Sequence, residues 1–390
     1  MDMQEIHCRH FNGYKPCGKS DVCSRGTCTS YQSVHERILM VHLGALGAVL
    51  RSTSLLAAIK RKYPRSHITW ITKAPAHHLL QGLNSIDRVL TLDPEDLLSL
   101  SALHFDLAFV IDKSLVAEGL LRRCGADEVR GFRADASGAI VPANSQAREL
   151  WEIGLSNQKK FFINTKTEQH LVHEALALGP YTRDEYQIAL STAEIQQVES
   201  RRRQWSPEGA PIIGINTGCS GVLPAKRLSV EGHRALISKI LRDSRFAGCS
   251  LVLLGGPEDT ERNELMAKGL PVTLSPTTRG LRDGLASVAA CDLVMTGDSL
   301  GMHMAIGLKK WVVAWFGPSC AQEVDLYGRG EKVRTLAPCS PCWKRVCQQP
   351  VMCYDQVDFD HCMTALSEGL CWLTSSSKPH SREISSSPSL

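Results

Sequence analysis

The chain has 390 residues, of which 43% are hydrophobic and 22% charged, and its formal net charge is +4. This length is too great for one ordinary domain and suits two α/β domains of about 150–180 residues each. The small net charge argues against a nucleic-acid partner, because nucleic-acid-binding proteins usually carry a concentrated basic face. The sequence shows no secretion signal, and no apolar run approaches the about 20 residues of a membrane span, so we expect a cytoplasmic protein.

Residues 1–36 form a head rich in Cys, Gly and Lys that precedes the first predicted strand. The head is too short to fold around an apolar core of its own, so a bound metal ion or an iron–sulfur cluster is one way to stabilise it. The alternative is disulfide bonds, which need an oxidising compartment that the sequence does not indicate. The candidate ligands of this N-terminal cluster are Cys8, Cys17, Cys23 and Cys28.

Regular α/β alternation begins after the head. The stretch "RILMVHL" (37–43) predicts a buried strand, the glycine turn "GALGA" follows, and residues 49–63 carry apolar side chains at helical spacing. A second strand, "HITWIT" (67–72), completes a β-α-β unit, which indicates a parallel sheet. The rest of this Rossmann-like domain (37–195) consists of predicted strands at 87–92, 105–112 and 129–132, a helix at 115–123 and a mostly helical stretch at 145–190.

The second half of the chain repeats this logic. A polar stretch that ends in Pro and Gly (196–210) is interpreted as the interdomain linker, and a second Rossmann-like domain is expected over 211–372. The polar, low-complexity tail (373–390) is predicted to be disordered. Ligands of such a pair of domains bind in a cleft at the carboxyl ends of the strands. The predicted elements of the second domain are strands at 211–218, 250–256, 292–297 and 311–317 and helices near 229–243, 257, 302–308 and 355–371.

The loop "GDSLG" (297–301) joins a predicted strand to a predicted helix. A helix amino end offers unpaired N–H groups and about half a positive charge. The Ser299 hydroxyl, the open backbone of Gly301 and a proton donor at His303 would complete a site for a pyrophosphate. The alternative is an ordinary turn in which Asp298 or Ser299 only caps the helix.

Two further loops follow strands of the same domain. In "NTGCSGVLPAKRLS" (216–229), Thr217 supplies a hydroxyl and Lys226 a cation, so this loop is a second candidate for the diphosphate. The alternative is that Lys226 is only a surface cation. In "LLGGPEDTE" (253–261), Glu258 or Glu261 is a candidate to accept hydrogen bonds from a ribose, unless either is simply an acid at a helix start.

A second cysteine cluster lies near the carboxyl end of the chain, with the spacing C-x2-C-x4-C-x5-C. Four thiolates this close fit tetrahedral binding of zinc or iron, in a structural rather than catalytic role. The alternative, buried small hydrophobes, rarely brings four cysteines into fifteen residues. The candidate ligands are Cys339, Cys342, Cys347 and Cys353, with Cys362 as a spare candidate.

Taken in order over about residues 37–370, these segments resemble the ADP-heptose:lipopolysaccharide heptosyltransferases of glycosyltransferase family nine. The most specific match is "GDSLGMHMAIGLKKWVVAWFGP" (297–318). The resemblance implies a GT-B fold and inverting transfer of heptose from ADP-heptose to a sugar acceptor, with no organic cofactor and no metal in catalysis. It also implies that Lys226 is the phosphate lysine, that Glu258 contacts the ribose, and that Asp298, Ser299, Gly301 and His303 form the diphosphate loop. A related branch, the bacterial autotransporter heptosyltransferases, is similar in having an iron site near its carboxyl end.

The sequence also departs from the family pattern. Ala48 stands where the family carries the aspartate taken as general base, and alanine cannot accept the proton of an acceptor hydroxyl. Asp112, at the end of a predicted strand, and His42, at the end of another, are the candidate replacements. The alternatives are that Asp112 is a cap and His42 a packed strand residue. Two smaller departures are Leu228 in place of Trp and the order Ser299-Leu300-Gly301.

The sequence therefore predicts an inverting glycosyltransferase that moves a heptose or similar sugar from an ADP-sugar to a lipopolysaccharide-core or other glycan acceptor. A lipid-linked acceptor would bring the protein to the inner face of the inner membrane. Two alternatives stay open: a catalytically weakened nucleotide-sugar-binding protein, because of Ala48, and a protein O-heptosyltransferase. A dinucleotide oxidoreductase is disfavoured, because the first glycine turn is G-x-x-G rather than G-x-G-x-x-G and no acid ends "HITWIT".

Overall fold

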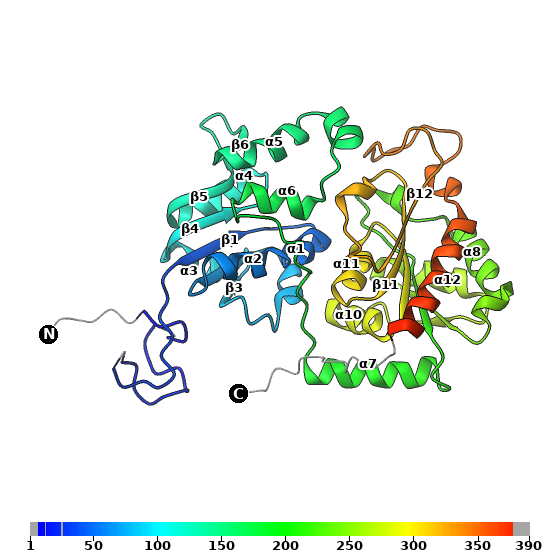
Figure 1. Cartoon of the computed structure of the whole chain (residues 1–390), viewed down its shortest axis with the longest axis horizontal. Coiled ribbons are helices and arrows are strands. Elements are labelled where there is room, and N and C mark those ends of the chain that lie inside the picture. Colours follow the sequence, from blue (N-terminus) through cyan, green and yellow to red (C-terminus); the bar gives the residue numbers. More distant parts are fainter. Residues whose placement is uncertain (1–6, 12, 25, 377–390) are drawn as a thin grey trace. The chain divides into compact units, whose positions relative to one another are not determined.

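The computed structural model describes residues 7–11, 13–24 and 26–376 (Figure 1). The chain divides into two compact units. The first takes its described residues from Met1–Ala45, Ser52–Asn157 and Glu168–Asp184, and the second from Leu46–Arg51, Gln158–Thr167 and Glu185–Leu390. Among the residues that the structure describes, every helix is too short or too polar to span a bilayer.

The first unit is built on a six-stranded sheet with the order β3-β2-β1-β4-β5-β6. The strands are parallel except for the antiparallel pair β5 and β6, and Met40 lies opposite Trp70 on one side and Phe109 on the other. This order is that of the Rossmann fold, whose ligands bind where the order reverses, between β1 and β4. The bounds are β1 Arg37–Val41, β2 His67–Ile71, β3 Arg88–Leu90, β4 His104–Val110, β5 Gly125–Ala134 and β6 Ile140–Pro142.

Helices cover both faces of this sheet. Leu100 and Leu120 pack on one face in a cluster with Leu39 and Val41, whereas the Tyr63 ring at the end of the second helix lies 6.4 Å from Phe109. The bounds are α2 Leu55–Lys62, η1 Ala76–Leu80, α3 Pro94–Ser101, α4 Leu115–Arg123, η2 Ser145–Ala147, α5 Arg148–Gly154 and α6 Glu168–Ala175.

Two helical predictions for the first half need correction. The stretch 49–63 is not one helix: α1 (Leu46–Ser52) and α2 are separated at Thr53 and Ser54, short polar residues that compete for backbone hydrogen bonds. The stretch 145–190 is helical only in part, because the chain leaves helix α6 and has no helix over 176–191. Gly179 and Pro180 lie in this stretch and disfavour helix.

The second unit repeats the topology. Its sheet has the order β12-β11-β10-β7-β8-β9, all parallel, and Met295 pairs with Ile215 on one side and Val313 on the other. The two sheets thus confirm the predicted pair of mostly parallel, Rossmann-like domains. The bounds are β7 Ile212–Asn216, β8 Ser250–Leu254, β9 Thr273–Leu274, β10 Leu293–Gly297, β11 Trp311–Phe316 and β12 Gly330–Arg334.

Helices α10 and α11 lie on one face of this sheet, and α8 and α12 lie on the other (Figure 1). Leu236 of α8 and Leu366 of α12 share a buried cluster with Met295. The bounds are η3 Lys159–Ile163, α7 Thr192–Trp205, η4 Pro224–Lys226, α8 Val230–Arg242, η5 Ser244–Phe246, η6 Pro257–Asp259, α9 Thr260–Ala267, α10 Leu281–Ala290, α11 Leu300–Gly307, η7 Ala321–Glu323, η8 Cys353–Gln356 and α12 Phe359–Ser376.

The segments predicted as linker and tail contain helix. Most of 196–210 lies in α7, which begins at the Ser191–Glu194 capping box and is held by the Arg201–Asp283 ion pair at 2.7 Å. Its polar composition is that of a capped, largely exposed helix, which composition alone does not distinguish from a linker. The start of the predicted tail (373–390) belongs to α12, and residues 377–390 lie outside the described part of the chain.

Candidate active site

The amino end of α11 presents the predicted anion loop. Ser299 is its N-cap, with extended backbone, and its hydroxyl accepts a hydrogen bond from the Met302 amide at 3.3 Å. The same hydroxyl lies 3.0 Å from Thr296 Oγ1 and accepts from Asn216 Nδ2 at 3.1 Å. The loop is therefore a capped helix start, as its alternative interpretation proposed, and it also lies at the carboxyl end of β10, where Rossmann folds bind ligands.

Lys226 and Asp298 come from two different loops and form an ion pair at this edge. Lys226 Nζ lies 2.6 Å from Asp298 Oδ2, and the two side chains are 16% and 14% exposed. Burial raises the pKa of Asp298, but the charges of Lys226 and His303 outweigh burial and hold that pKa below its usual range. Asp298 is therefore ionised near neutral pH, and the ion pair holds the Lys226 side chain beside the amino end of α11.

Glycines allow this close packing. A Cβ on Gly301 would lie 2.6 Å from Cγ of Asn216, and a Cβ on Gly297 would lie 2.2 Å from the Lys226 carbonyl oxygen. That carbonyl also accepts a hydrogen bond from Trp315 Nε1 at 3.1 Å. Asn216 joins the loops that follow β7 and β10 by donating to Gly218 O, Thr296 Oγ1 and Ser299 Oγ. Sequence analysis did not predict a role for Asn216. The only sequence signal was that this polar residue ends the apolar run of β7.

His303 lies in the first turn of α11 and is buried. Its Nδ1 is 3.1 Å from the hydroxyl of Tyr186, a residue that no sequence motif indicated. Gly47 of α1 packs against the imidazole, since a Cβ there would lie 2.5 Å from His303 Cδ2. Ala48 follows directly, so the position of the family's aspartate is one residue from the contact with His303.

The two other residues predicted to contact the donor, Thr217 and Glu258, lie in different surroundings: one is buried and the other is exposed. Thr217 is fully buried, and its hydroxyl donates to Leu254 O and Asn263 Oδ1, so it ties its loop to the end of β8 and to α9. Glu258 is exposed near Gly256. Its neighbour Asp259 is buried, and its carboxylate lies under Gly218, where a Cβ would be 1.9 Å from Asp259 Oδ2.

The candidate bases lie in the first unit. His42 follows β1 and is buried, and Asp112 follows β4, the strand next to it. The Leu43 amide donates a hydrogen bond to Asp112 Oδ2. Burial raises the pKa of Asp112 to about 6, and the Leu43 amide, Lys73 and Lys113 offset burial only in part. A carboxylate with this pKa is half protonated near pH 6 and is suited to accept a proton near neutrality.

The carboxyl-terminal cysteine cluster packs against the Lys226 loop. Cys353 is buried with Ala225 and Ala337, and a Cβ on Gly317 would lie 2.9 Å from Cys353 Sγ. Burial raises the pKa of the Cys353 thiol to about 11, and the nearby thiols of Cys342, Cys347 and Cys339 add to the rise. The other three thiols therefore lie within electrostatic reach of Cys353. The spare candidate, Cys362, lies in α12 and is part of the hydrophobic core.

Trp343, inside this cluster, contacts two lysines. Lys226 Nζ lies 5.1 Å from the centre of its ring and Lys160 Nζ lies 4.3 Å from it. The backbone amide of Trp343 donates to Pro318 O at 2.9 Å. The cysteine segment thus holds an aromatic face against the candidate phosphate lysine, a contact that sequence analysis did not predict.

The four N-terminal cysteines are half-buried and carry free thiols. Cys8 pairs with Ser33 in an isolated antiparallel bridge, and the Cys28 amide donates to Ser24 O at 3.0 Å. Within the described residues, no group of three or more His, Cys, Asp or Glu side chains has an arrangement that could hold a metal ion. Both predicted metal sites stay predictions.

Comparison with known proteins defines the class. The family model "Glycosyltransferase family 9 (heptosyltransferase)" matches residues 99–352. The match covers more than half of the chain, so the chain belongs to this family and is a glycosyltransferase. This finding confirms the resemblance and the enzyme class that the sequence predicted.

Individual proteins and solved structures of the same family also resemble this chain. Lipopolysaccharide heptosyltransferase 2 of Escherichia coli (strain K12) is 24% identical over 301 residues, which are 73% of this chain and 83% of that protein. The crystal structure of a family 9 glycosyl transferase from Veillonella parvula aligns with a TM-score of 0.69 and 18% identity, over 87% of this chain and 98% of that one. The structure of E. coli ADP-heptose lipopolysaccharide heptosyltransferase II aligns with a TM-score of 0.60 and 19% identity, over 88% and 100%. These likenesses confirm the predicted GT-B fold.

Proposed function

We propose that this protein transfers a heptose from ADP-heptose to a saccharide acceptor with inversion at the anomeric carbon. Membership of the heptosyltransferase family supports heptosyl transfer, and the E. coli relative named for ADP-heptose supports the donor. The observation that carries the proposal is the Lys226–Asp298 pair at the amino end of α11. It puts a fixed cation and a helix amino end on one edge of the sheet, which is what a diphosphate requires.

The donor diphosphate is bound by Lys226, by the amide groups at the start of α11 and by the imidazole of His303. As the bond from the anomeric carbon to the phosphate oxygen breaks, ADP leaves with the electron pair. The negative charge that develops on the diphosphate is stabilised by Lys226 and the helix amino end. Asp298 keeps the Lys226 ammonium group oriented, and Glu258 is the proposed contact for the ribose.

The acceptor hydroxyl attacks the anomeric carbon from the opposite side, so a single displacement inverts its configuration. Asp112 is the proposed general base and takes the hydroxyl proton. Its support is its place after β4, beside the reversal point of the strand order, and its pKa of about 6. His42, buried at the end of β1, is the second candidate base.

Two other functions remain candidates. Ala48 favours a catalytically weakened protein that binds a nucleotide sugar without turning it over. The acceptor proposed is a lipopolysaccharide-core glycan, with a protein acceptor as the alternative. A cytoplasmic location with contact to the inner membrane stays a prediction of the sequence.

The test is an assay of the purified chain with ADP-heptose and core-glycan acceptors, in which released ADP is measured, together with calorimetry of ADP binding. The proposal expects ADP binding and acceptor-dependent ADP release. Binding without release would favour the weakened binding protein. The donor site is disproved if ADP does not bind at millimolar concentration, or binds equally well to the double variant Lys226→Ala, His303→Ala.

We also propose that Cys339, Cys342, Cys347 and Cys353 bind zinc or iron in a structural role. Three of these thiols raise the pKa of the fourth, Cys353, and thiolates are ligands that suit either metal. Metal analysis of the anaerobically purified protein should find one ion that Cys353→Ser loses, whereas Cys371→Ser, at an exposed thiol of α12, keeps it. A second ion or an iron–sulfur cluster at Cys8, Cys17, Cys23 and Cys28 would be lost in Cys23→Ser. A metal-free wild-type protein would contradict both sites.

A further inference from the structure

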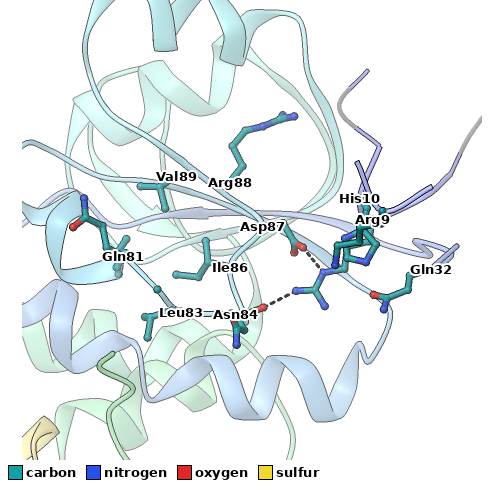
Figure 2. A pocket seen from close by; sticks show the side chains of 13 residues that line it. Arg9, His10, Gln32, Gln81, Leu83, Asn84, Ile86, Asp87, Arg88 and Val89 are labelled. Carbon is teal, nitrogen blue, oxygen red and sulfur yellow. Dashed lines mark hydrogen bonds and ion pairs between the residues drawn. The ribbon is translucent and has the colours of Figure 1, made fainter. Parts of the chain in front are cut away.

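A pocket of about 630 Å³ lies at the amino edge of the first unit's sheet (Figure 2). One wall is the loop that leads from η1 into β3, and it includes Leu83, Asn84 and Asp87. The other wall is the cysteine-rich head, which contributes Arg9, His10, Lys19 and Gln32. The candidate bases His42 and Asp112 follow the carboxyl ends of β1 and β4, so this pocket is separate from the site described above. A five-residue strand of about 3.3 Å per residue separates the two edges of the sheet.

Arg9 fastens the head to the sheet. Its Nε forms an ion pair with Asp87 Oδ1, and its NH2 group donates to Asn84 O at 2.6 Å (Figure 2). The Arg9 amide donates to Gln32 O at 2.8 Å. The other Asp87 oxygen accepts from the Ile68 amide at 2.8 Å. The carboxylate of the pocket is therefore fully used in building its wall.

The remaining charged groups of the pocket are cations. Lys19 and Arg88 line it and, within the described part of the chain, make no ion pair. Burial, together with the positive charges of Lys19 and Arg9, lowers the pKa of His10. With Asp87 matched to Arg9, the lining has uncompensated positive charge. The opposite side is apolar, with Leu80, Leu83, Ile86 and Val89.

We propose that this pocket binds a phosphate-bearing ligand, whose phosphate contacts Lys19 and Arg88 and whose organic part lies on the apolar wall. Lysine and arginine suit a phosphate group because each can donate a charge-assisted hydrogen bond to it. Lys19 comes from the head and Arg88 from β3, and in Figure 2 the Arg88 side chain extends away from Arg9 and His10, so a phosphate would lie between the two walls of the pocket. The volume of about 630 Å³ is large enough for a ligand of the size of a sugar phosphate or a lipid headgroup. The site assigns a function to the head that does not depend on the donor site or on the transfer reaction.

The test uses the full-length protein in the Lys226→Met, Asp298→Asn background, which weakens phosphate binding at the donor site without leaving Asp298 as an unpaired buried charge. Glycerol 3-phosphate is titrated by calorimetry, and vesicles of phosphatidylglycerol or of phosphatidylcholine are tested by flotation. We expect binding to glycerol 3-phosphate, to phosphatidylglycerol vesicles, or to both. The responding arm identifies a soluble phosphate ester or a lipid headgroup as the source.

Lys19→Glu and Arg88→Glu should each weaken this binding about tenfold or more, because each removes a charge-assisted hydrogen bond. Arg123→Glu is the matched control, since Arg123 is exposed on the same unit but does not line the pocket. Unchanged thermal unfolding of the variants shows that the fold is kept. The proposal is overturned if neither ligand binds, or if the Lys19 and Arg88 variants bind as well as the Arg123 control.

Discussion

The aspartates that follow the fourth strands of the two sheets have opposite pKa shifts. Asp112 follows β4 and Asp298 follows β10, and each of these strands pairs with the first strand of its own sheet. Burial raises the pKa of Asp112 to about 6. The Leu43 amide and the nearby lysines offset the effect of burial only in part. Burial acts on Asp298 as well, but Lys226 and His303 reverse its effect and lower the pKa.

The difference shows that topology fixes where a carboxylate lies, whereas its neighbours fix what it can do. At Asp298 a lysine 2.6 Å away gives an ion pair, which orients a cation at the proposed diphosphate site. At Asp112 the hydrogen bond comes from the neutral Leu43 amide, and the carboxylate keeps the ability to take up a proton. The predictions below test this division of roles.

Asp112→Asn should have the largest effect. Transfer should fall about 100-fold or more, because the acceptor loses the proposed general base. ADP affinity should not change. The free energy of unfolding at pH 8 should not fall, since the variant removes a charge whose burial is unfavourable there. Steady-state ADP release, calorimetry and thermal unfolding measure the three quantities. If turnover stays near normal, Asp112 is not the base. His42 is then the candidate base, and His42→Gln tests it.

Lys226→Met should weaken ADP binding about tenfold or more, because a charge-assisted hydrogen bond to the diphosphate is lost. It should also destabilise the fold by about 3 kcal/mol, since Asp298 is left as an unpaired buried charge. The double variant Lys226→Met, Asp298→Asn is the control and should recover the stability but not the ADP affinity. A single variant as stable as the wild type would contradict the ion pair's structural role.

Ala48→Asp introduces the aspartate that the resemblance to the family implies at this position. If Asp112 is a replacement base, the Asp112→Asn, Ala48→Asp double variant should regain about tenfold or more of the activity lost in Asp112→Asn. Ala48→Asn, which offers no carboxylate, is the matched control. Equal rates for the two double variants, with ADP binding intact, would argue against a base at position 48.

The pH dependence should follow Asp112. Its pKa of about 6 in the folded protein lies above the ordinary 3.8, so it is protonated below pH 6 and cannot accept a proton there. The value of kcat/KM should fall about tenfold per pH unit below 6 and level off above it. The same shift means that the carboxyl favours the folded state at low pH and that this contribution is lost as the pH rises through 6. An acidic limb that persists in Asp112→Asn would assign it to another group.

Trp343→Leu should have the smallest effect. Loss of its contact with Lys226 should weaken ADP binding about three- to tenfold, in keeping with a partly buried cation–π contact. Trp343→Phe should lie between the wild type and Trp343→Leu, because a smaller aromatic face is kept. Phe162→Leu, at an exposed aromatic side chain, is the control and should bind ADP normally. If all three variants bind ADP with equal affinity, the cysteine segment has no role in donor binding.

The sequence predicted some of the residues around Asp112 and around Asp298. The apolar runs and the loops after them placed Asp112, Lys226, Asp298 and His303 near strand ends, because a buried parallel strand is a short apolar run that local pattern detects. Asn216, Tyr186 and Trp343 were missed. Each contacts its partner across a long sequence separation, and none has a local pattern that marks it.

By itself, the sequence determined two Rossmann-like domains, the loops that carry the charged residues and the family to which the chain belongs. Only the tertiary structure decided which charges meet. Asp112 and Asp298 look alike in sequence, as single acids after apolar strands, and the pKa of each depends on burial and on cations from other loops. Electrostatic energy depends on distance in space rather than along the chain, and folding alone sets that distance.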